Sequence, residues 1–195
     1  MIGFFFESVG IVTTTRVTHA TPAGLFGHVA DRDWESFDGK AYTQAIKDQG
    51  CKDLAVQLIE DHSQYIDVIF AGGRVKFMSK NDTDPFNQDL TGDRIDGRNL
   101  IDEWEQKMKK LNKKYKYVWN YESFKELKPN QYTNILGLLA HNHMDYEYER
   151  RNATPINQPS LIETTRKAIE LLSTNPNGYF LLSEGIHQFN INFNI

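Results

Sequence analysis

Runs of apolar residues alternate with amphipathic segments along the chain. Short apolar runs predict strands over residues 9–15, 66–70, 115–119, 134–139 and 179–182. Helices are predicted over residues 21–29, 52–61, 99–111, 122–127 and 159–172. Strands that alternate with helices indicate an α/β fold, in which a largely parallel sheet has helices on both faces.

The helical segments also carry more specific signals. Thr21 followed by Pro22 predicts an N-cap with proline in the first turn. The positions expected to be buried are Leu54, Val56, Leu58 and Ile59 in the second helix, and Leu161, Ala168, Ile169 and Leu172 in the last. Residues 82–97 are polar and rich in turn-forming types, so we expect a loop there and a turn at residues 175–178.

Composition and charge narrow the class of protein. The 195 residues suit one domain with a sizeable core, and 39% hydrophobic with 25% charged residues is typical of a globular protein. A net charge of -4 argues against general nucleic-acid binding, because phosphate neutralisation needs a basic surface. The basic run at residues 107–117 is expected to be the solvated end of a helix.

The residues give conflicting signals about the cellular compartment of the protein. The apolar runs are too short to cross a bilayer, and the opening MIGFFF, which lacks basic residues, is a poor secretory signal. A single cysteine, Cys51, suggests either a reducing compartment or a small buried hydrophobic residue. Asn81 and Asn152 begin glycosylation sequons and favour secretion instead.

Two predicted strands end in residues that bear chemistry. The first continues to His19 and Thr21, and the last continues to Glu184. Ligands of open α/β sheets bind beyond the carboxyl ends of the strands. If these two strands are neighbours, a hydroxyl and a carboxylate meet at one edge, and both are hard oxygen ligands of the kind that suits magnesium. The alternative reading is that Thr21 is a plain N-cap and Glu184 a surface acid.

Arg32 lies between Asp31 and Asp33, so an ion pair with either acid is what these residues alone favour. His28 is expected to be a polar surface residue.

Several longer segments occur along the chain in a characteristic order: GIVTTTRVTHATPA, ADRDW, GCKDLAVQLI, DVIFAGGR, DRIDGRNLIDEW, LGLL, PSLIETTRKAIELL and NPNGYFLLSEG. Together they resemble the animal alkaline phosphatase family over Ser8 to Gly185.

The resemblance implies an incomplete three-layer sandwich with a mostly parallel central sheet and helices on both faces. Residues 1–195 would form a single partial domain, of which residues 1–7 and 186–195 depart from the family. The family's members hydrolyse phosphate monoesters with two Zn²⁺ ions and one Mg²⁺ ion, through a phosphoserine intermediate, and form homodimers. They act outside the cell or at its surface, often on a GPI anchor, although this sequence shows neither a signal peptide nor an anchor signal.

Residue roles follow from the same resemblance. Thr21 and Glu184 would be magnesium ligands, and His19 would lie close to that metal without being a principal ligand. Arg32 would bind the substrate phosphate with two hydrogen bonds, which suits a planar guanidinium better than a lysine.

The resemblance also predicts what this chain lacks. The family's nucleophilic serine, a bridging aspartate and the partner of Cys51 would lie upstream of the first strand. Most zinc ligands would follow Glu184, where His187 is the only plausible ligand and is out of register. The acids that bind calcium in vertebrate members are replaced at residues 84–86, 139–140 and 157–159, so no calcium site is predicted. We therefore expect an inactive chain, or alternatively a non-catalytic truncated product that folds poorly or associates with full-length enzyme.

Overall fold

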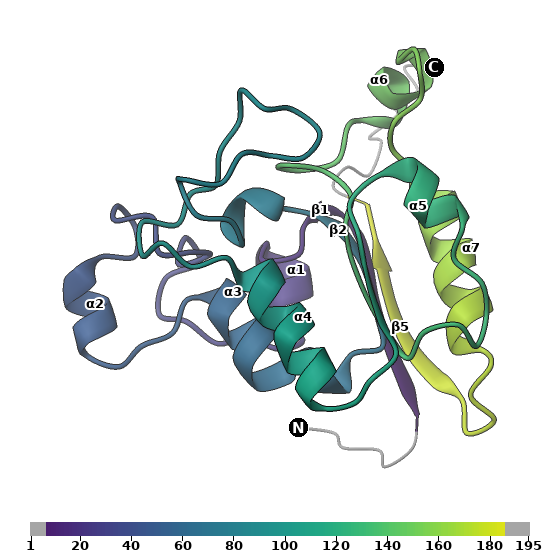
Figure 1. Cartoon of the computed structure of the whole chain (residues 1–195), viewed down its shortest axis with the longest axis horizontal. Helices are drawn as coiled ribbons and strands as arrows, with labels where there is room; N and C mark the ends of the chain where they lie inside the picture. Colours follow the sequence, from purple (N-terminus) through teal and green to yellow (C-terminus); the bar gives the residue numbers. More distant parts are fainter. Residues whose placement is uncertain (1–6, 186–195) are drawn as a thin grey trace, which may run out of the picture.

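Five parallel strands form the centre of the molecule. The computed structural model describes residues 7–185. Its strands are β1 (Ser8–Arg16), β2 (Val68–Gly72), β3 (Tyr115–Val118), β4 (Asn134–Leu138) and β5 (Tyr179–Glu184). They lie in the order β3-β4-β2-β1-β5, and every neighbouring pair is parallel. All the carboxyl ends of the strands therefore meet at one edge of the sheet (Figure 1).

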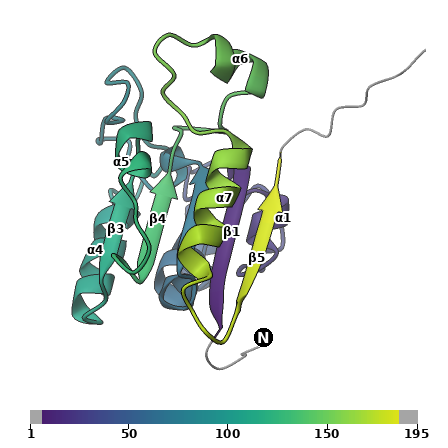
Figure 2. The ribbon, with the colours of Figure 1, turned by 90° about the vertical axis from the view of Figure 1, so that its right-hand side faces the viewer.

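Helices cover both faces of this sheet, as predicted. The helices are α1 (Ala20–Ala23), α2 (Gln44–Asp48), α3 (Leu54–Val56), α4 (Leu100–Lys110), α5 (Tyr121–Lys125), α6 (Glu147–Asn152) and α7 (Leu161–Leu172). A π-helical turn at Gln57–His62 and 3-10 turns at Ser63–Tyr65 and Arg74–Lys76 complete the described elements. Figure 2 shows α5 and α7 in front of the strands and α4 behind them. The fold is an α/β three-layer sandwich.

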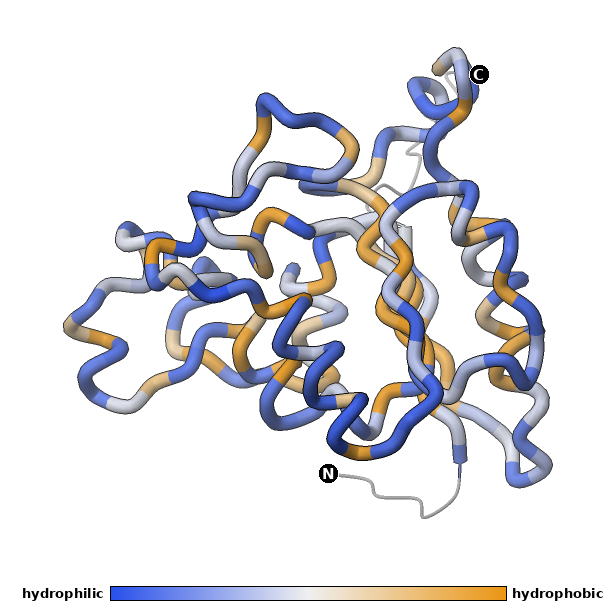
Figure 3. Tube along the Cα trace, in the orientation of Figure 1, coloured by the Kyte–Doolittle hydropathy of each residue, from blue (hydrophilic) through white to orange (hydrophobic). Residues whose placement is uncertain are grey.

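Alternation along the strands explains why both faces are apolar. Successive side chains of a strand point to opposite faces. Ile11 and Ile69 pack with α1, α3 and α4, whereas Val12 and Phe70 pack with α5 and α7. Figure 3 shows the apolar segments concentrated along the central strands. A Cβ atom on Gly10 would lie 2.6 Å from Leu172 Cδ1, so the missing side chain lets α7 approach β1.

The helices differ from prediction in several details. Leu54, Val56, Leu58 and Ile59 are buried as expected, but they lie on one short α-helix followed by the π-helical turn. In α7 the prediction for Ile169 is wrong, because its side chain is 41% exposed and Leu171 is buried instead. Leu161 is only half-buried. The burial of Ile169 was predicted wrongly because the apolar stripe of α7 is narrow, and a residue at the border of such a stripe can face the core or the solvent.

α1 is also placed differently. It begins at Ala20 with His19 as N-cap and ends at Ala23, so the predicted N-cap at Thr21 and helix end at Val29 are both wrong. Pro22 is the third helical residue. Proline is tolerated there because the first N–H groups of a helix have no partner within it. The hydroxyl of Thr21 is therefore not used for capping.

Two short helices escaped prediction because they have almost no apolar face. None of the residues of α2 is buried, and in α6 only Arg150 is. Residues 82–97 form the expected loop, with an isolated bridge between Thr83 and Thr91. Across residues 7–185, the helices are all too short or too polar to cross a bilayer.

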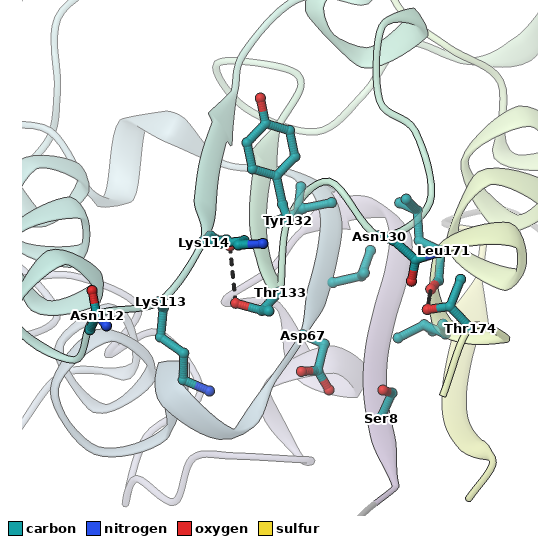
Figure 4. Close-up of a pocket in the computed structure, with 13 residues that line it drawn as sticks. Ser8, Asp67, Asn112, Lys113, Lys114, Asn130, Tyr132, Thr133, Leu171 and Thr174 are labelled. Carbon is teal, nitrogen blue, oxygen red and sulfur yellow. Dashed lines mark hydrogen bonds between the residues drawn. The ribbon is translucent and has the colours of Figure 1, made fainter. Parts of the chain in front are cut away.

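One pocket of about 390 Å³ lies at the amino-terminal edge of the sheet, opposite the residues singled out by the sequence (Figure 4). The polar side chains that line this pocket form hydrogen bonds with backbone groups. Thr133 Oγ1 donates to the carbonyl of Lys114, and Thr174 Oγ1 donates to that of Leu171. Asp67 accepts a hydrogen bond from Val9 N at 2.7 Å. These contacts serve the fold, and the candidate chemistry lies at the other edge.

Candidate functional site

The carboxyl ends of β1 and β5 bring Thr21 and Glu184 together. The two strands are neighbours, with Thr13 opposite Glu184 in their register. Thr21 Oγ1 donates a hydrogen bond to Glu184 Oε1 over 3.1 Å. Thr21 is exposed and Glu184 is half-buried. The reading of Thr21 as a plain N-cap is wrong, and the predicted meeting of a hydroxyl with a carboxylate is observed.

Arg32 lies beside His19. Its guanidinium Nη2 donates to His19 Nε2 over 3.2 Å, and the side chain is exposed. Among the ion pairs of residues 7–185, Arg32 forms none with Asp31 or Asp33. The Asp31 carboxylate instead accepts a hydrogen bond from Asp33 N. The acids beside Arg32 therefore leave its guanidinium directed toward His19.

The electrostatics of His19 fit this contact. Partial burial lowers the pKa of His19, and the positive charges of Arg16 and Arg32 add to the effect while Glu35 and Glu184 oppose it. A lowered pKa favours neutral imidazole, which can accept a hydrogen bond at one ring nitrogen. His19 can thus accept from Arg32 at neutral pH.

A partly buried ion pair lies behind these residues, and sequence reasoning missed it. Arg16 donates to both oxygens of Glu35, from Nε over 2.8 Å and from Nη2 over 2.7 Å. Thr18 Oγ1 donates to Glu35 Oε2 over 2.6 Å. Burial raises the pKa of Glu35, but the hydrogen bonds from Arg16 and Thr18 outweigh burial and lower it overall. Glu35 follows Arg32 by three residues, so this pair anchors the loop that bears Arg32.

The segment after β4 completes the edge. Asn142 Oδ1 accepts a hydrogen bond from Arg16 Nη1 over 2.7 Å. His143 Nε2 also lies 2.7 Å from Arg16 Nη1. The rings of His143 and His19 meet edge-on, with centroids 5.2 Å apart. The signal available in the sequence was the run His141 to His143, directly after the apolar strand β4.

The donor set can be compared with the metals that the resemblance implies. Thr21 and Glu184 supply two hard oxygen atoms at one point, which fits part of a magnesium shell. Within the described range 7–185, no three His, Cys, Asp or Glu residues gather in a way that could hold a metal ion. These residues do not fit zinc, which takes three or four such ligands. His187 lies outside the described residues.

The remaining predicted positions lie on the surface or away from the site. Cys51 is a free, exposed cysteine, and Asn81, Asn152 and His28 are exposed. At the positions considered for calcium, Asp84 is buried and accepts from Arg74 Nε over 2.8 Å and from Nη2 over 3.0 Å. Burial raises the pKa of Asp84, but Arg74 outweighs it and lowers that pKa to about 2.

The chain is similar to known proteins over most of its length. The model of the alkaline phosphatase family matches residues 6–188. The chain is 44% identical to alkaline phosphatase of Gadus morhua over 182 residues, covering 92% of this chain and 36% of that protein. It is 40% identical to membrane-bound alkaline phosphatase of Bombyx mori over 180 residues, covering 92% of this chain and 32% of that protein. The chain thus spans about a third of the length of these relatives.

Solved structures match in the same way. The alkaline phosphatase of Thermus thermophilus has a TM-score of 0.61 and 27% identity, covering 90% of this chain and 28% of that chain. A mutant alkaline phosphatase of the Antarctic bacterium TAB5, with Mg bound in its M3 site, has a TM-score of 0.53 and 17% identity, covering 90% of this chain and 37% of that chain. The second likeness concerns the fold alone. The chain belongs to the alkaline phosphatase family.

Proposed function

We propose that this chain carries the phosphate-binding side, and part of the magnesium-binding side, of a phosphomonoester hydrolase. The observation that carries the proposal is the convergence at one sheet edge of Thr21 with Glu184 and of His19 with Arg32. These are the four residues to which the family resemblance assigns roles. Thr21 lies on α1, His19 and Arg32 lie in the chain just before and after that helix, and Glu184 comes from the end of β5, far along the sequence.

Arg32 is the residue that would bind phosphate. Its guanidinium is exposed, and its planar array of N–H groups can donate two parallel hydrogen bonds to phosphate oxygens. Neutral His19 orients the guanidinium by accepting from Nη2 and adds no competing negative charge. The chain can thereby present a cation to the substrate without losing it to Asp31 or Asp33.

Thr21 and Glu184 would hold magnesium. The bound cation would supply charge that stabilises negative oxygens of a phosphoryl group. The carboxylate of Glu184 provides a negative charge and Thr21 provides a neutral oxygen. Their hydrogen bond keeps these two oxygen ligands next to each other. The Mg bound in the M3 site of a mutant TAB5 alkaline phosphatase is consistent with this choice of cation.

Phosphate binding is tested by titrating the chain with inorganic phosphate and following the ³¹P NMR signal. Arg32→Ala is expected to abolish binding, and Arg32→Lys to weaken it by about 10-fold because one hydrogen bond of the pair is lost. Arg151→Ala is the control, since that exposed arginine lies on α6 and is paired with Glu147. Equal binding by wild type and Arg32→Ala would disprove the assignment.

A polypeptide of these 195 residues is expected to lack measurable turnover. Within residues 7–185, no three His, Cys, Asp or Glu residues gather as zinc ligands would. The family resemblance places the attacking serine upstream of the first strand. Covalent catalysis and an activated water would then both be missing. A purified chain that hydrolyses a chromogenic phosphate ester at alkaline pH, with zinc and magnesium supplied, would refute this expectation.

The alternative function is association with a full-length enzyme of the family, as a non-catalytic partner. The exposed aromatic side chains Tyr179 and Phe180 on the edge strand β5 favour it. Co-purification of the chain with such an enzyme would support this function. Homodimer formation, as in the family, and a place at the cell surface, as the membrane-bound relative of Bombyx mori suggests, are part of the same proposal.

A further inference from the structure

His143 occupies a central position at the carboxyl edge of the sheet. Its Nε2 lies 2.7 Å from Arg16 Nη1, and its Nδ1 accepts from Arg16 N over 3.2 Å. Its ring also meets the ring of His19 edge-on at 5.2 Å. The segment after β4 is thus joined to the end of β1 through one half-buried imidazole.

Two routes lead from His143 to Arg32. The first passes through His19, whose Nε2 accepts from Arg32 Nη2. The second passes through Arg16, which is paired with Glu35, and Glu35 lies on the loop that bears Arg32. The side chain of Arg32 is held by the first route and its backbone by the second. Both routes converge on the ring of His143.

We propose that His143 is a positioning residue for Arg32, acting on the phosphate-binding guanidinium through His19 and through the pair Arg16–Glu35. The inference rests on the proposed phosphate-binding role of Arg32. His143 itself does not touch Arg32, so its effect is on where the guanidinium points. At metal sites, residues that orient a ligand in this indirect way change the affinity by about 10- to 100-fold when they are replaced, and we expect the lower end of that range for phosphate here.

The hydrogen-bond chemistry of the ring allows the two routes to be separated. Arg16 presents an N–H donor to each ring nitrogen, and neutral imidazole accepts at one nitrogen only. Asn in place of His143 retains an acceptor for Arg16 and removes the ring beside His19. Phe in that place retains a ring beside His19 and removes the acceptor.

The experiment titrates the wild-type chain, His143→Asn and His143→Phe with inorganic phosphate, followed by ³¹P NMR. It also records ¹⁵N spectra of the imidazole of His19 without phosphate. We expect each variant to bind phosphate about 10-fold more weakly and to shift the His19 Nε2 signal, because the hydrogen bond from Arg32 is displaced. His28→Asn is the control, because His28 is exposed and, within residues 7–185, its side chain forms no hydrogen bond with Arg32, His19 or Arg16.

The outcomes separate this inference from the proposed function. If Arg32→Ala abolishes phosphate binding and neither His143 variant changes it, the inference is wrong and the function stands. If Arg32→Ala has no effect, the proposed function is wrong. A purely structural role of His143 would lower the melting temperature of both variants without moving the His19 signal, and that result would overturn the inference. Weaker binding with a moved signal in either variant supports it and identifies the route.

Discussion

At the scale of single residues, Glu184 offers the most direct test of the magnesium half-site. Glu184→Gln retains an oxygen that can accept from Thr21 but removes the negative charge, which hard cations require. We expect the affinity for Mg²⁺, measured by isothermal titration calorimetry, to fall by about 10-fold, because the amide oxygen that remains carries no charge. Glu122→Gln, an exposed position on α5, should bind Mg²⁺ as the wild type does. Identical affinities in all three proteins would contradict the assignment.

Asp84 gives a prediction about acid stability. Its folded pKa, about 2, lies below its ordinary value of 3.8 because Arg74 outweighs the effect of burial. The stabilisation is therefore fully present above about pH 4 and is lost as the pH falls toward 2. Asp84→Asn leaves Arg74 buried without a carboxylate, so we expect a loss of about 3 kcal/mol at pH 7.

Urea unfolding at several pH values tests this expectation. The free energy of unfolding of Asp84→Asn should fall less steeply than that of the wild type between pH 4 and 2, because the titrating carboxyl is gone. Asp89→Asn, at an exposed position of the same loop, should retain the wild-type slope. A wild-type slope in Asp84→Asn would mean that another group carries the acid sensitivity.

At the scale of elements, the start of α7 depends on a capping box. Ser160 Oγ accepts from Glu163 N over 3.2 Å, and Glu163 Oε2 accepts from Ser160 N over 2.8 Å. Ser160→Ala is expected to lower the free energy of unfolding by about 1 kcal/mol. Ser173→Ala, at the exposed carboxyl end of the same helix, should change it by less than about 0.5 kcal/mol. Thermal unfolding compares the two, and equal losses would argue against a specific role of the cap.

The elements also explain what the sequence could and could not predict. The strands were found because each is a short run rich in β-branched, aromatic or other apolar residues, and their parallel arrangement followed from the alternation with helices. The meeting of Thr21 with Glu184 was foreseen because it depends only on β1 and β5 being neighbours. His143 and Glu35 were missed because their contacts depend on the path of loops, which periodicity does not encode. The short helix α1 was misplaced because Thr21 and Pro22 permit more than one starting residue.

At the scale of the whole molecule, the two outer strands of the sheet, β3 and β5, differ in chemistry. β3 carries the exposed Lys116, and a lysine on an edge strand discourages pairing with another chain. Among the described strands, β5 pairs with β1 only, and its Tyr179 and Phe180 are 39% and 50% exposed. We therefore expect this chain to self-associate through the edge formed by β5.

Sedimentation velocity over a range of protein concentrations measures that association. Phe180→Lys adds a charge to the β5 edge and should shift the chain toward monomer at each concentration. Tyr148→Lys makes the same change in charge on α6, where the tyrosine is 78% exposed, and should leave the distribution as in the wild type. If both variants dissociate equally, net charge rather than the β5 edge governs association. If neither does, the contact lies elsewhere on the molecule, and the exposed aromatic residues of β5 do not determine how this chain meets its partners.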